Sequence, residues 1–139
     1  AVTEEAKNSD IIIKAAAVAD YTPLNVSDNK IKKKDGDMSI ALKRTKDIIG
    51  TLGEHKKEGQ FICGFSMETE NIIANSKDKL IKKNMDMIVA NNVKVAGAGF
   101  GTDTNVVPII TGEDNIELPM MSKEDVASKI LDFIMAKRR

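Results

Sequence analysis

Three short apolar runs, separated by stretches of helical periodicity, limit what this chain can fold into. The runs occupy residues 11–13, 61–66 and 87–90, and the first consists of three consecutive isoleucines. Contiguous β-branched residues are typical of a strand that is covered on both faces, as in parallel sheets. Such strands alternating with helices predict a doubly wound α/β fold. We therefore expect a mostly parallel, doubly wound sheet that carries an antiparallel hairpin at one end.

Three helices are expected from capping residues and apolar periodicity. Thr45 can cap a helix that runs to about His55, with Asp47 in its first turn, where the helix dipole favours an anion. A second helix is expected over residues 70–83 and a third from Ser122. The side chains expected to face the sheet are Ile72, Ile73, Ser76, Leu80 and Ile81 in the second helix, and Val126, Ala127, Ile130, Leu131 and Ile134 in the third.

Two turn sequences predict antiparallel hairpins. The first turn is Asp35-Gly36, and the second runs from Gly112 to Asn115. The paired segments are residues 30–33 with 38–42, and residues 106–111 with 116–120. Asn91 and Asn92 are expected to end the third apolar run in a turn. A loop is expected over residues 97–105, which are rich in glycine and do not match the phosphate-binding pattern G-x-x-x-x-G-K-[ST].

The composition argues against several classes of protein. Lysine plus arginine equals aspartate plus glutamate at 21 each, so nothing suggests a nucleic acid or a membrane as partner. We expect no signal peptide or membrane-spanning segment, and a cytoplasmic location. The single Cys63 lies in the apolar sequence FICGF, which predicts a reduced core residue. His55, the only histidine, lies in the polar sequence EHKKEG, is expected to be solvated, and has no metal-binding partner nearby in the sequence.

Residues 10–34 are the candidate ligand-binding stretch. The isoleucine run leads into four alanines between positions 15 and 19, which leave room for a ligand to lie against the main chain. Asp20 follows at the expected carboxyl end of the strand, where open α/β sheets bind ligands. Four lysines between positions 30 and 34 can bind an anion. Alternatively, the alanines pack against a helix, Asp20 caps a turn, and the lysines are solvated charges that protect an edge strand from aggregation.

Five segments along the chain form a series of motifs: AAAVADYTP at 15–23, KIKK at 30–33, GFSMETEN at 64–71, KLIKKNMDMIVAN at 79–91 and GFGTDTN at 99–105. They resemble, in the same order, the motifs of phosphopantothenate-cysteine ligase, the synthetase part of the bacterial coenzyme A bifunctional flavoprotein. The glycine-rich strand-turn-helix that precedes these motifs in the family does not occur in the sequence. Residues 1–139 are therefore expected to be a fragment of the ligase domain.

The resemblance implies roles for nine residues. Lys30 resembles a catalytic lysine on a flap that closes over the nucleotide, and Asp20 and Phe65 would help to seat the nucleotide. Lys79 and Lys83, four residues apart on one helix face, would bind its phosphates, although they could equally complement the negative end of the helix. Backbone contacts to the nucleotide are implied for Thr45, Lys46, Asp47 and Ile48, where Lys46 replaces a proline that relatives often carry. Glu68 is expected to act only on the amino end of the following helix.

The reaction implied by the resemblance has two steps. The carboxylate of 4'-phosphopantothenate attacks the α-phosphate of CTP and releases pyrophosphate, and the cysteine amine then displaces CMP to give 4'-phosphopantothenoylcysteine. Mg²⁺ would accompany the triphosphate, and FMN would occur only in a fused decarboxylase domain. The resemblance also implies a Rossmann-like, three-layer α/β fold and a homodimer or a higher oligomer.

Two other functions remain open from the sequence. The chain could be a nucleotide-binding module without ligase activity, or a fragment of an NAD-binding dehydrogenase. The dehydrogenase is disfavoured, because no G-x-G-x-x-G follows a strand. The side chains alone do not discriminate CTP from ATP.

Overall fold

The computed structural model describes residues 1–33, 35–68, 70–92 and 103–138. The chain forms two compact units: Ala1–Ala15 with Ile48–Arg139, which we call the sheet unit, and Ala16–Asp47, which we call the arm. Lys34, which we expected to be solvated, and residues 97–102 of the expected loop lie outside the described residues.

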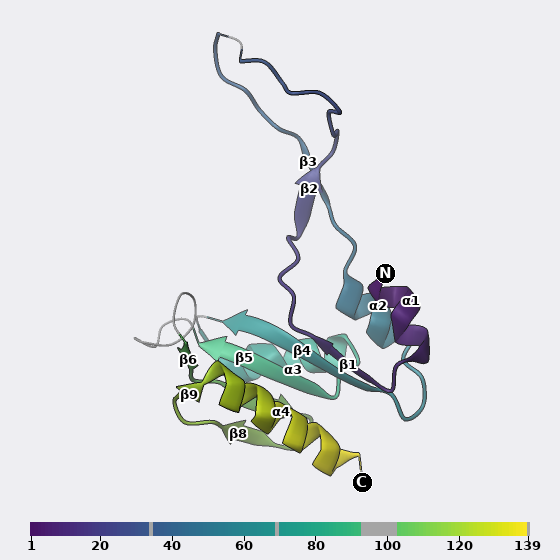
Figure 1. Ribbon diagram of the computed structural model, residues 1–139, viewed down its shortest axis with the longest axis vertical. Coiled ribbons are helices and arrows are strands. Elements are labelled where there is room, and N and C mark those ends of the chain that lie inside the picture. The colour runs from purple at the N-terminus through teal and green to yellow at the C-terminus, as the bar shows by residue number, and fades with distance from the viewer. Residues whose placement is uncertain (34, 69, 93–102, 139) are drawn as a thin grey trace. The chain divides into compact units, whose positions relative to one another are not determined.

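The sheet unit contains a five-stranded sheet in the order β1-β4-β5-β7-β8. Strands β1, β4 and β5 are parallel, and β5, β7 and β8 are antiparallel to one another in turn. The bounds are β1 Ile11–Lys14, β4 Phe61–Glu68, β5 Met87–Asn92, β7 Pro108–Thr111 and β8 Asn115–Glu117. The hairpin of β7 and β8 turns where Gly112 to Asn115 predicted it. The mostly parallel α/β sheet with an antiparallel hairpin is therefore confirmed (Figure 1).

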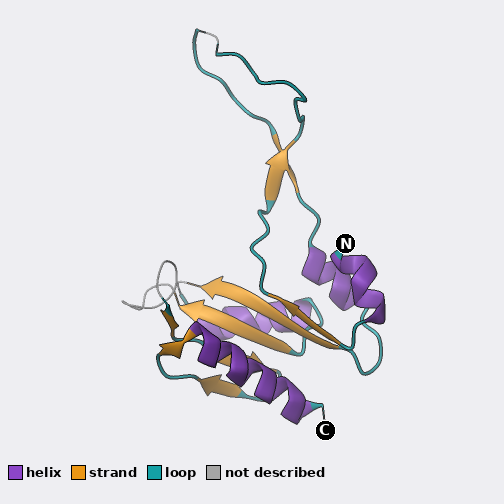
Figure 2. Cartoon of the chain, viewed as in Figure 1, coloured by secondary structure: helices purple, strands orange, loops and turns teal. Residues whose placement is uncertain are grey.

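Helices cover both faces of this sheet. Figure 2 shows α3 behind the strands and α4 in front of them. The helices are α1 Val2–Glu5, the 3₁₀ turn η1 Ala6–Asn8, α2 Ile48–Glu54, α3 Ile72–Lys82 and α4 Lys123–Lys137. A separate two-stranded sheet pairs β6 Thr104–Asn105 with β9 Met121–Ser122. The predicted cap of the last helix is confirmed, because the Asp125 amide donates to Ser122 Oγ at 3.0 Å.

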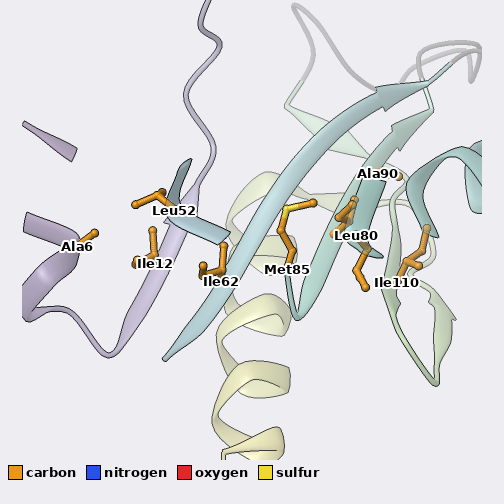
Figure 3. Packing of buried hydrophobic residues seen from close by; sticks show 9 residues of the cluster. Ala6, Ile12, Leu52, Ile62, Leu80, Met85, Ala90 and Ile110 are labelled. Atoms are coloured by element: carbon orange, nitrogen blue, oxygen red, sulfur yellow. The ribbon is translucent and has the colours of Figure 1, made fainter. Parts of the chain in front are cut away.

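Alternate residues of the central strands fill two separate apolar cores. Ile62 and Ile88 lie in the core on the α3 side, and Cys63 and Met87 lie in the core on the α4 side. Figure 3 shows Ile62 and Ile110 from the strands with Leu80 from α3 in the first core. Because successive side chains of a strand point to opposite faces, a side chain's position along β4 fixes which face of the sheet it reaches.

A partly buried carboxylate links β4 to β5 at their amino ends. Asp86 Oδ2 accepts the Ile62 amide at 2.7 Å, and its Oδ1 binds Lys56 Nζ at 2.6 Å. The Lys56 side chain is 17% exposed and that of Asp86 is 30% exposed, so this ion pair is partly shielded from water. The same carboxylate therefore satisfies a strand amide and a nearly buried cation.

The arm contains a short antiparallel ladder of β2 Tyr21–Pro23 and β3 Leu42–Arg44. Residues 30–33 are not a strand, so the predicted hairpin around Asp35-Gly36 is wrong. Its alternating apolar residues are exposed, at 65% for Ile31 and 68% for Met38. A two-stranded hairpin without an apolar face to bury is marginal in water, and the strand pattern alone could not compensate for that.

Other corrections concern the extent of burial. Ile13 of β1 is 39% exposed, because β1 lies at the edge of the described sheet, whereas the sequence predicted cover on both faces. Asn91 and Asn92 lie within β5 and do not form the turn that ends it. The two predicted helix stripes are also narrower in the structure. Ser76, Leu80, Val126, Ile130 and Ile134 are buried, whereas Ile73, Ile81, Ala127 and Leu131 are exposed.

Candidate functional site

The carboxyl end of β4 brings together charged and polar groups from β4 and α3. Lys79 Nζ lies 2.5 Å from Glu68 Oε1, and Asn75 Nδ2 donates to Glu68 Oε2 at 3.4 Å. Ser66 Oγ lies 3.1 Å from Ser76 Oγ of α3, and Ser66 precedes Glu68 by two residues along β4. These contacts lie at the edge where open α/β sheets bind their ligands.

Lys79 reaches this edge because of the direction of its helix. A helix that joins two adjacent parallel strands runs back along the sheet, so the last turn of α3 lies toward the amino ends of β4 and β5. Helical side chains point toward the helix amino end, and the long lysine stem follows that direction to Glu68. The Lys79 side chain is 48% exposed, so its ammonium is held by Glu68 and is still open to solvent.

Lys83 is placed differently from Lys79. It follows α3 as the C-cap residue, four positions or roughly 6 Å farther from the carboxyl edge at 1.5 Å per residue. Its backbone packs against Gly53 of α2, because a Cβ atom on Gly53 would collide with the Lys83 carbonyl oxygen. The structure therefore gives Lys79 a partner at the carboxyl edge and fixes the backbone of Lys83 against α2.

The opposite face of the same edge carries Phe65 and an amide pair. Phe65 alternates with Ser66, so its ring lies on the α4 side of the sheet, where it is 36% exposed. Asn91 of β5 shares that face, and its Oδ1 accepts from Asn105 Nδ2 at 2.8 Å. Phe65 and Lys79 therefore approach the carboxyl edge from opposite faces of the sheet. Sequence reasoning missed the pairing of Asn91 with Asn105, because it assigned both to turns or loops.

Five of the predicted site residues belong to the arm. These are Asp20, Lys30, Thr45, Lys46 and Asp47. The Thr45 hydroxyl donates to the Ala19 carbonyl at 2.6 Å, and the Thr45 amide donates to the Asp20 carbonyl at 2.9 Å. Thr45 thus extends the ladder of the arm. The sequence predicted that Thr45 caps the next helix, and that prediction is wrong. Lys30 lies in the irregular segment between β2 and β3 and is exposed.

Four predicted site residues belong to the sheet unit: Ile48, Phe65, Lys79 and Lys83. Ile48 begins α2 and packs, partly buried, against the core on the α3 side. The structure therefore supplies an apolar contact for the Ile48 side chain.

Glu68 departs from its predicted role. It is the last residue of β4, its side chain is only 10% exposed, and its close partner is Lys79 from the last turn of α3. The sequence predicted an effect on the amino end of this helix. Spacing gave no signal for the pair, because the two residues lie eleven positions apart on different elements.

Two hollows that the sequence did not indicate are lined by described residues of the sheet unit. One, of about 590 Å³, lies against the start of α3 and has a largely apolar lining that includes Ile72, Val107 and Leu118. The other, of about 620 Å³, lies near the amino end of β4 and is lined by charged residues that include Lys56, Lys137 and Asp86. In the second hollow Lys56 is paired with Asp86 and Lys137 with Asp114, and Lys57 Nζ donates to the Lys7 carbonyl.

Cys63 and His55 both match their predicted surroundings. Cys63 is buried as predicted, and burial, with a smaller effect of the Asp86 charge, raises the pKa of its thiol to about 12. His55 is exposed as predicted, and its Nδ1 lies 2.9 Å from the Thr51 carbonyl. Among the described residues, no three His, Cys, Asp or Glu side chains come close enough to hold a metal ion. None of the helices in the same residues has the length and apolarity to cross a membrane.

Known proteins resemble this chain over nearly its whole length. The family model described as DNA/pantothenate metabolism flavoprotein C-terminal domain matches residues 1–137. The coenzyme A biosynthesis bifunctional protein CoaBC of Bacillus subtilis (strain 168) is 55% identical over 129 residues, which cover 92% of this chain and 32% of that protein. A cysteine/cysteine sulfinic acid decarboxylase of an unknown prokaryotic organism is 46% identical over 136 residues, which cover 97% of this chain and 38% of that protein. The chain thus spans about a third of the length of these relatives.

A solved structure has the same fold. The crystal structure of the C-terminal domain of the coenzyme A biosynthesis bifunctional protein CoaBC superposes with a TM-score of 0.76 at 42% identity. The match covers 98% of this chain and 60% of that one. It agrees with the mixed, mainly parallel sheet described above.

Proposed function

We propose that this chain acts in the ligase that joins 4'-phosphopantothenate to cysteine in coenzyme A biosynthesis. The chain belongs to the DNA/pantothenate metabolism flavoprotein C-terminal domain family, and this membership is the premise of the proposal. The observation that carries the proposal is the position of Phe65 and Lys79. Both belong to segments that resemble ligase motifs, and both approach the carboxyl edge of the parallel strands. That edge is the usual ligand-binding position of such sheets.

The proposed chemistry is activation of a carboxylate by a nucleotide. The carboxylate of 4'-phosphopantothenate attacks the α-phosphate of CTP, the bond to the β-phosphate breaks, and pyrophosphate leaves. The cysteine amine then attacks the acyl carbonyl, CMP leaves with the bonding electron pair, and the amine loses a proton. Fixed cations accelerate such a step when they lie where negative charge develops.

Each predicted site residue has a proposed part in this reaction. Lys79 would bind the triphosphate, and Phe65 would lie against the nucleotide. Lys83 would add a second cation, and Lys30 of the arm would stabilise the reacting phosphate. Asp20 would help to seat the nucleotide, and the backbone from Thr45 through Lys46 and Asp47 to Ile48 would contact it.

Magnesium would arrive with the triphosphate. Mg²⁺ is usually held by one or two carboxylates together with substrate phosphates, so it does not require a protein cage. The described residues do not gather three potential metal ligands, and Glu68 at the carboxyl edge is already paired with Lys79. No residue of the described chain is therefore assigned to the metal.

A homodimer in the cytoplasm forms part of the proposal. Large apolar side chains of the arm are exposed, including Tyr21 at 52%, Ile31 at 65% and Ile40 at 60%. Several large exposed apolar side chains on one segment favour a surface that another chain covers. A second copy of this chain is the proposed occupant, and sedimentation of the full-length protein at several concentrations tests it. A monomer at every concentration would contradict the homodimer.

The decisive experiment measures pyrophosphate release by the full-length protein before any cysteine is added. The mixture contains 4'-phosphopantothenate and Mg²⁺ with either CTP or ATP. Release with CTP alone is the expected result, and release with ATP would keep the ligase but change its nucleotide. Folded protein that binds nucleotide and releases no pyrophosphate would favour a nucleotide-binding module without ligase activity.

Two substitutions connect the assay to the proposed site. Lys30→Ala should slow pyrophosphate release and leave the fold intact, and an unchanged rate would remove Lys30 from the mechanism. The double substitution of Lys79→Ala with Lys83→Ala should raise the dissociation constant for CTP. Lys82→Ala, on the same helix and exposed, is the matched control. Equal binding by the double variant and the control would assign the two lysines to the helix end.

A further inference from the structure

We propose that Glu68 is a positioning residue that holds the Lys79 ammonium where it can bind the phosphates of the nucleotide. This inference rests on the proposed function and adds a residue to it. Glu68 itself would not touch the nucleotide, and its effect would pass through Lys79. The sequence motif that contains Glu68 gives no such role on its own, because the contact joins two different elements.

The argument begins with the difference in exposure within the pair. The Glu68 side chain is 10% exposed, whereas the Lys79 side chain is 48% exposed. A nearly buried carboxylate is costly unless a cation or several hydrogen bonds compensate it. Lys79 at 2.5 Å provides the cation, and within the described residues the other side-chain contact of this carboxylate is the 3.4 Å bond that Asn75 Nδ2 donates. The ion pair with Lys79 therefore stabilises the buried charge of Glu68, and it restricts the Lys79 ammonium to one position.

The ammonium group keeps capacity for a ligand while Glu68 holds it. A lysine ammonium has three N–H donors, and Glu68 Oε1 takes one of them. The remaining donors belong to a half-exposed group at the carboxyl edge of the sheet, where a phosphate can approach from solvent. One cation can thus bind the buried carboxylate and a phosphate oxygen at the same time.

Positioning improves binding because a lysine is otherwise flexible. Its four-carbon stem samples many rotamers, and a ligand that fixes it must offset the lost entropy. Glu68 removes that freedom during folding, before the nucleotide arrives, which is preorganisation. The negative charge of Glu68 acts in the opposite direction by repelling phosphates. We expect preorganisation to dominate, because the three-donor ammonium lies between the carboxylate and the ligand.

The test is a double-mutant cycle on the dissociation constant for CTP with Mg²⁺, measured by calorimetry on the full-length protein. Glu68→Gln keeps the size of the side chain and removes its charge, and we expect the dissociation constant to rise about tenfold, which is 1.4 kcal/mol at 25 °C. Lys79→Ala should raise it at least as much. In the Lys79→Ala background, Glu68→Gln should add no further loss, because its effect passes through Lys79.

Two controls separate positioning from general effects of charge and fold. Asp78→Asn removes a carboxylate from the exposed residue next to Lys79 and should change the dissociation constant less than twofold. Lys79→Arg keeps a cation beside Glu68 but moves its donors, so it should also weaken binding. Circular dichroism identifies the folded variants, and Lys79→Arg keeps the proposal testable if Glu68→Gln does not fold.

Several results would overturn the inference. An equal loss from Glu68→Gln with and without Lys79 would mean that Glu68 acts only on the fold. Tighter CTP binding by Glu68→Gln would mean that repulsion dominates, and unchanged binding by Lys79→Arg would mean that position does not matter. A parent protein that binds no nucleotide would overturn the proposed function as well, which distinguishes that failure from the others.

Discussion

The sheet unit and the arm use similar side chains in opposite ways. In the sheet unit, Ile62, Met87 and Ile110 are 0% exposed, and each lies in one of two cores on either side of the strands. In the arm, Val26 is 83% exposed and Ile31 is 65% exposed. Both regions contain β-branched residues, which favour strands, so local preference for a strand does not account for the difference.

The difference shows what an apolar pattern needs in order to become a strand. The isoleucines of the sheet unit have helices to pack against on both faces, whereas the ladder of the arm has two short strands. Burial contributes roughly 25 cal/mol per Å² of apolar surface, and a two-stranded ribbon buries too little to offset its ordering. The sheet unit is therefore expected to contribute most of the free energy of unfolding, and the exposed arm is expected to contribute little.

The largest test of this comparison substitutes isoleucine in each region. Ile62→Ala should lower the free energy of unfolding by about 2–5 kcal/mol, because it removes a fully buried side chain and leaves a cavity. Ile31→Ala is the same change in the arm and should cost under about 0.5 kcal/mol. Urea unfolding followed by circular dichroism gives both values. Similar losses at the two positions would mean that the arm has a core of its own.

The second test asks whether polar contacts follow the same division between buried and exposed. Asp86→Asn removes the charge that pairs with Lys56 and weakens the acceptor for the Ile62 amide. The expected loss is about 1–3 kcal/mol, since the Lys56 ammonium, on a side chain that is only 17% exposed, is left without its carboxylate. Glu4→Gln breaks an exposed ion pair with Lys7, and the expected loss is below about 0.5 kcal/mol. Equal losses in urea unfolding would contradict the role of burial.

The third test uses pH to probe the core at Cys63. Burial raises the pKa of its thiol from 9.0 to about 12, so the folded state disfavours the thiolate. The resulting stability is fully present below pH 9 and is lost as the pH rises from 9 toward 12. Between pH 8 and pH 10, the free energy of unfolding should fall by about 1 kcal/mol more in the parent than in Cys63→Ala. An identical pH dependence would mean that Cys63 is accessible to water in the folded protein.

The sequence predicted the parts of this protein that depend on local pattern. The alternation of apolar runs and helices gave the parallel strands, the hairpin of β7 and β8, and the cap at Ser122. It failed where tertiary contact decides. The pattern at residues 30–33 and 38–42 predicts strands, but nothing in the arm covers Ile31 or Met38 within the described residues.

The candidate site shows the same division. The motifs pointed to Phe65 and Lys79, and the structure places both near the carboxyl end of β4. Side chains alternate along β4, so Phe65 and the Glu68 partner of Lys79 lie on opposite faces. Which face each one takes is known only from the pairing of β4 with β5 and from the contact of Ser66 with Ser76 of α3. The pairs Glu68 with Lys79 and Asn91 with Asn105 join separate elements, so no spacing in the sequence could identify them.

The smallest expected effect is also the result that could most directly contradict the comparison. Val26→Thr keeps the shape of a side chain that is 83% exposed and replaces one methyl group with a hydroxyl group. The free energy of unfolding should change by less than about 0.5 kcal/mol, because the hydroxyl remains in water. A loss that appears only at protein concentrations where a dimer forms would mean that a second copy covers Val26. A loss above 1 kcal/mol at every concentration would mean that the arm packs its apolar residues within the chain, and the contrast with the sheet unit would no longer hold.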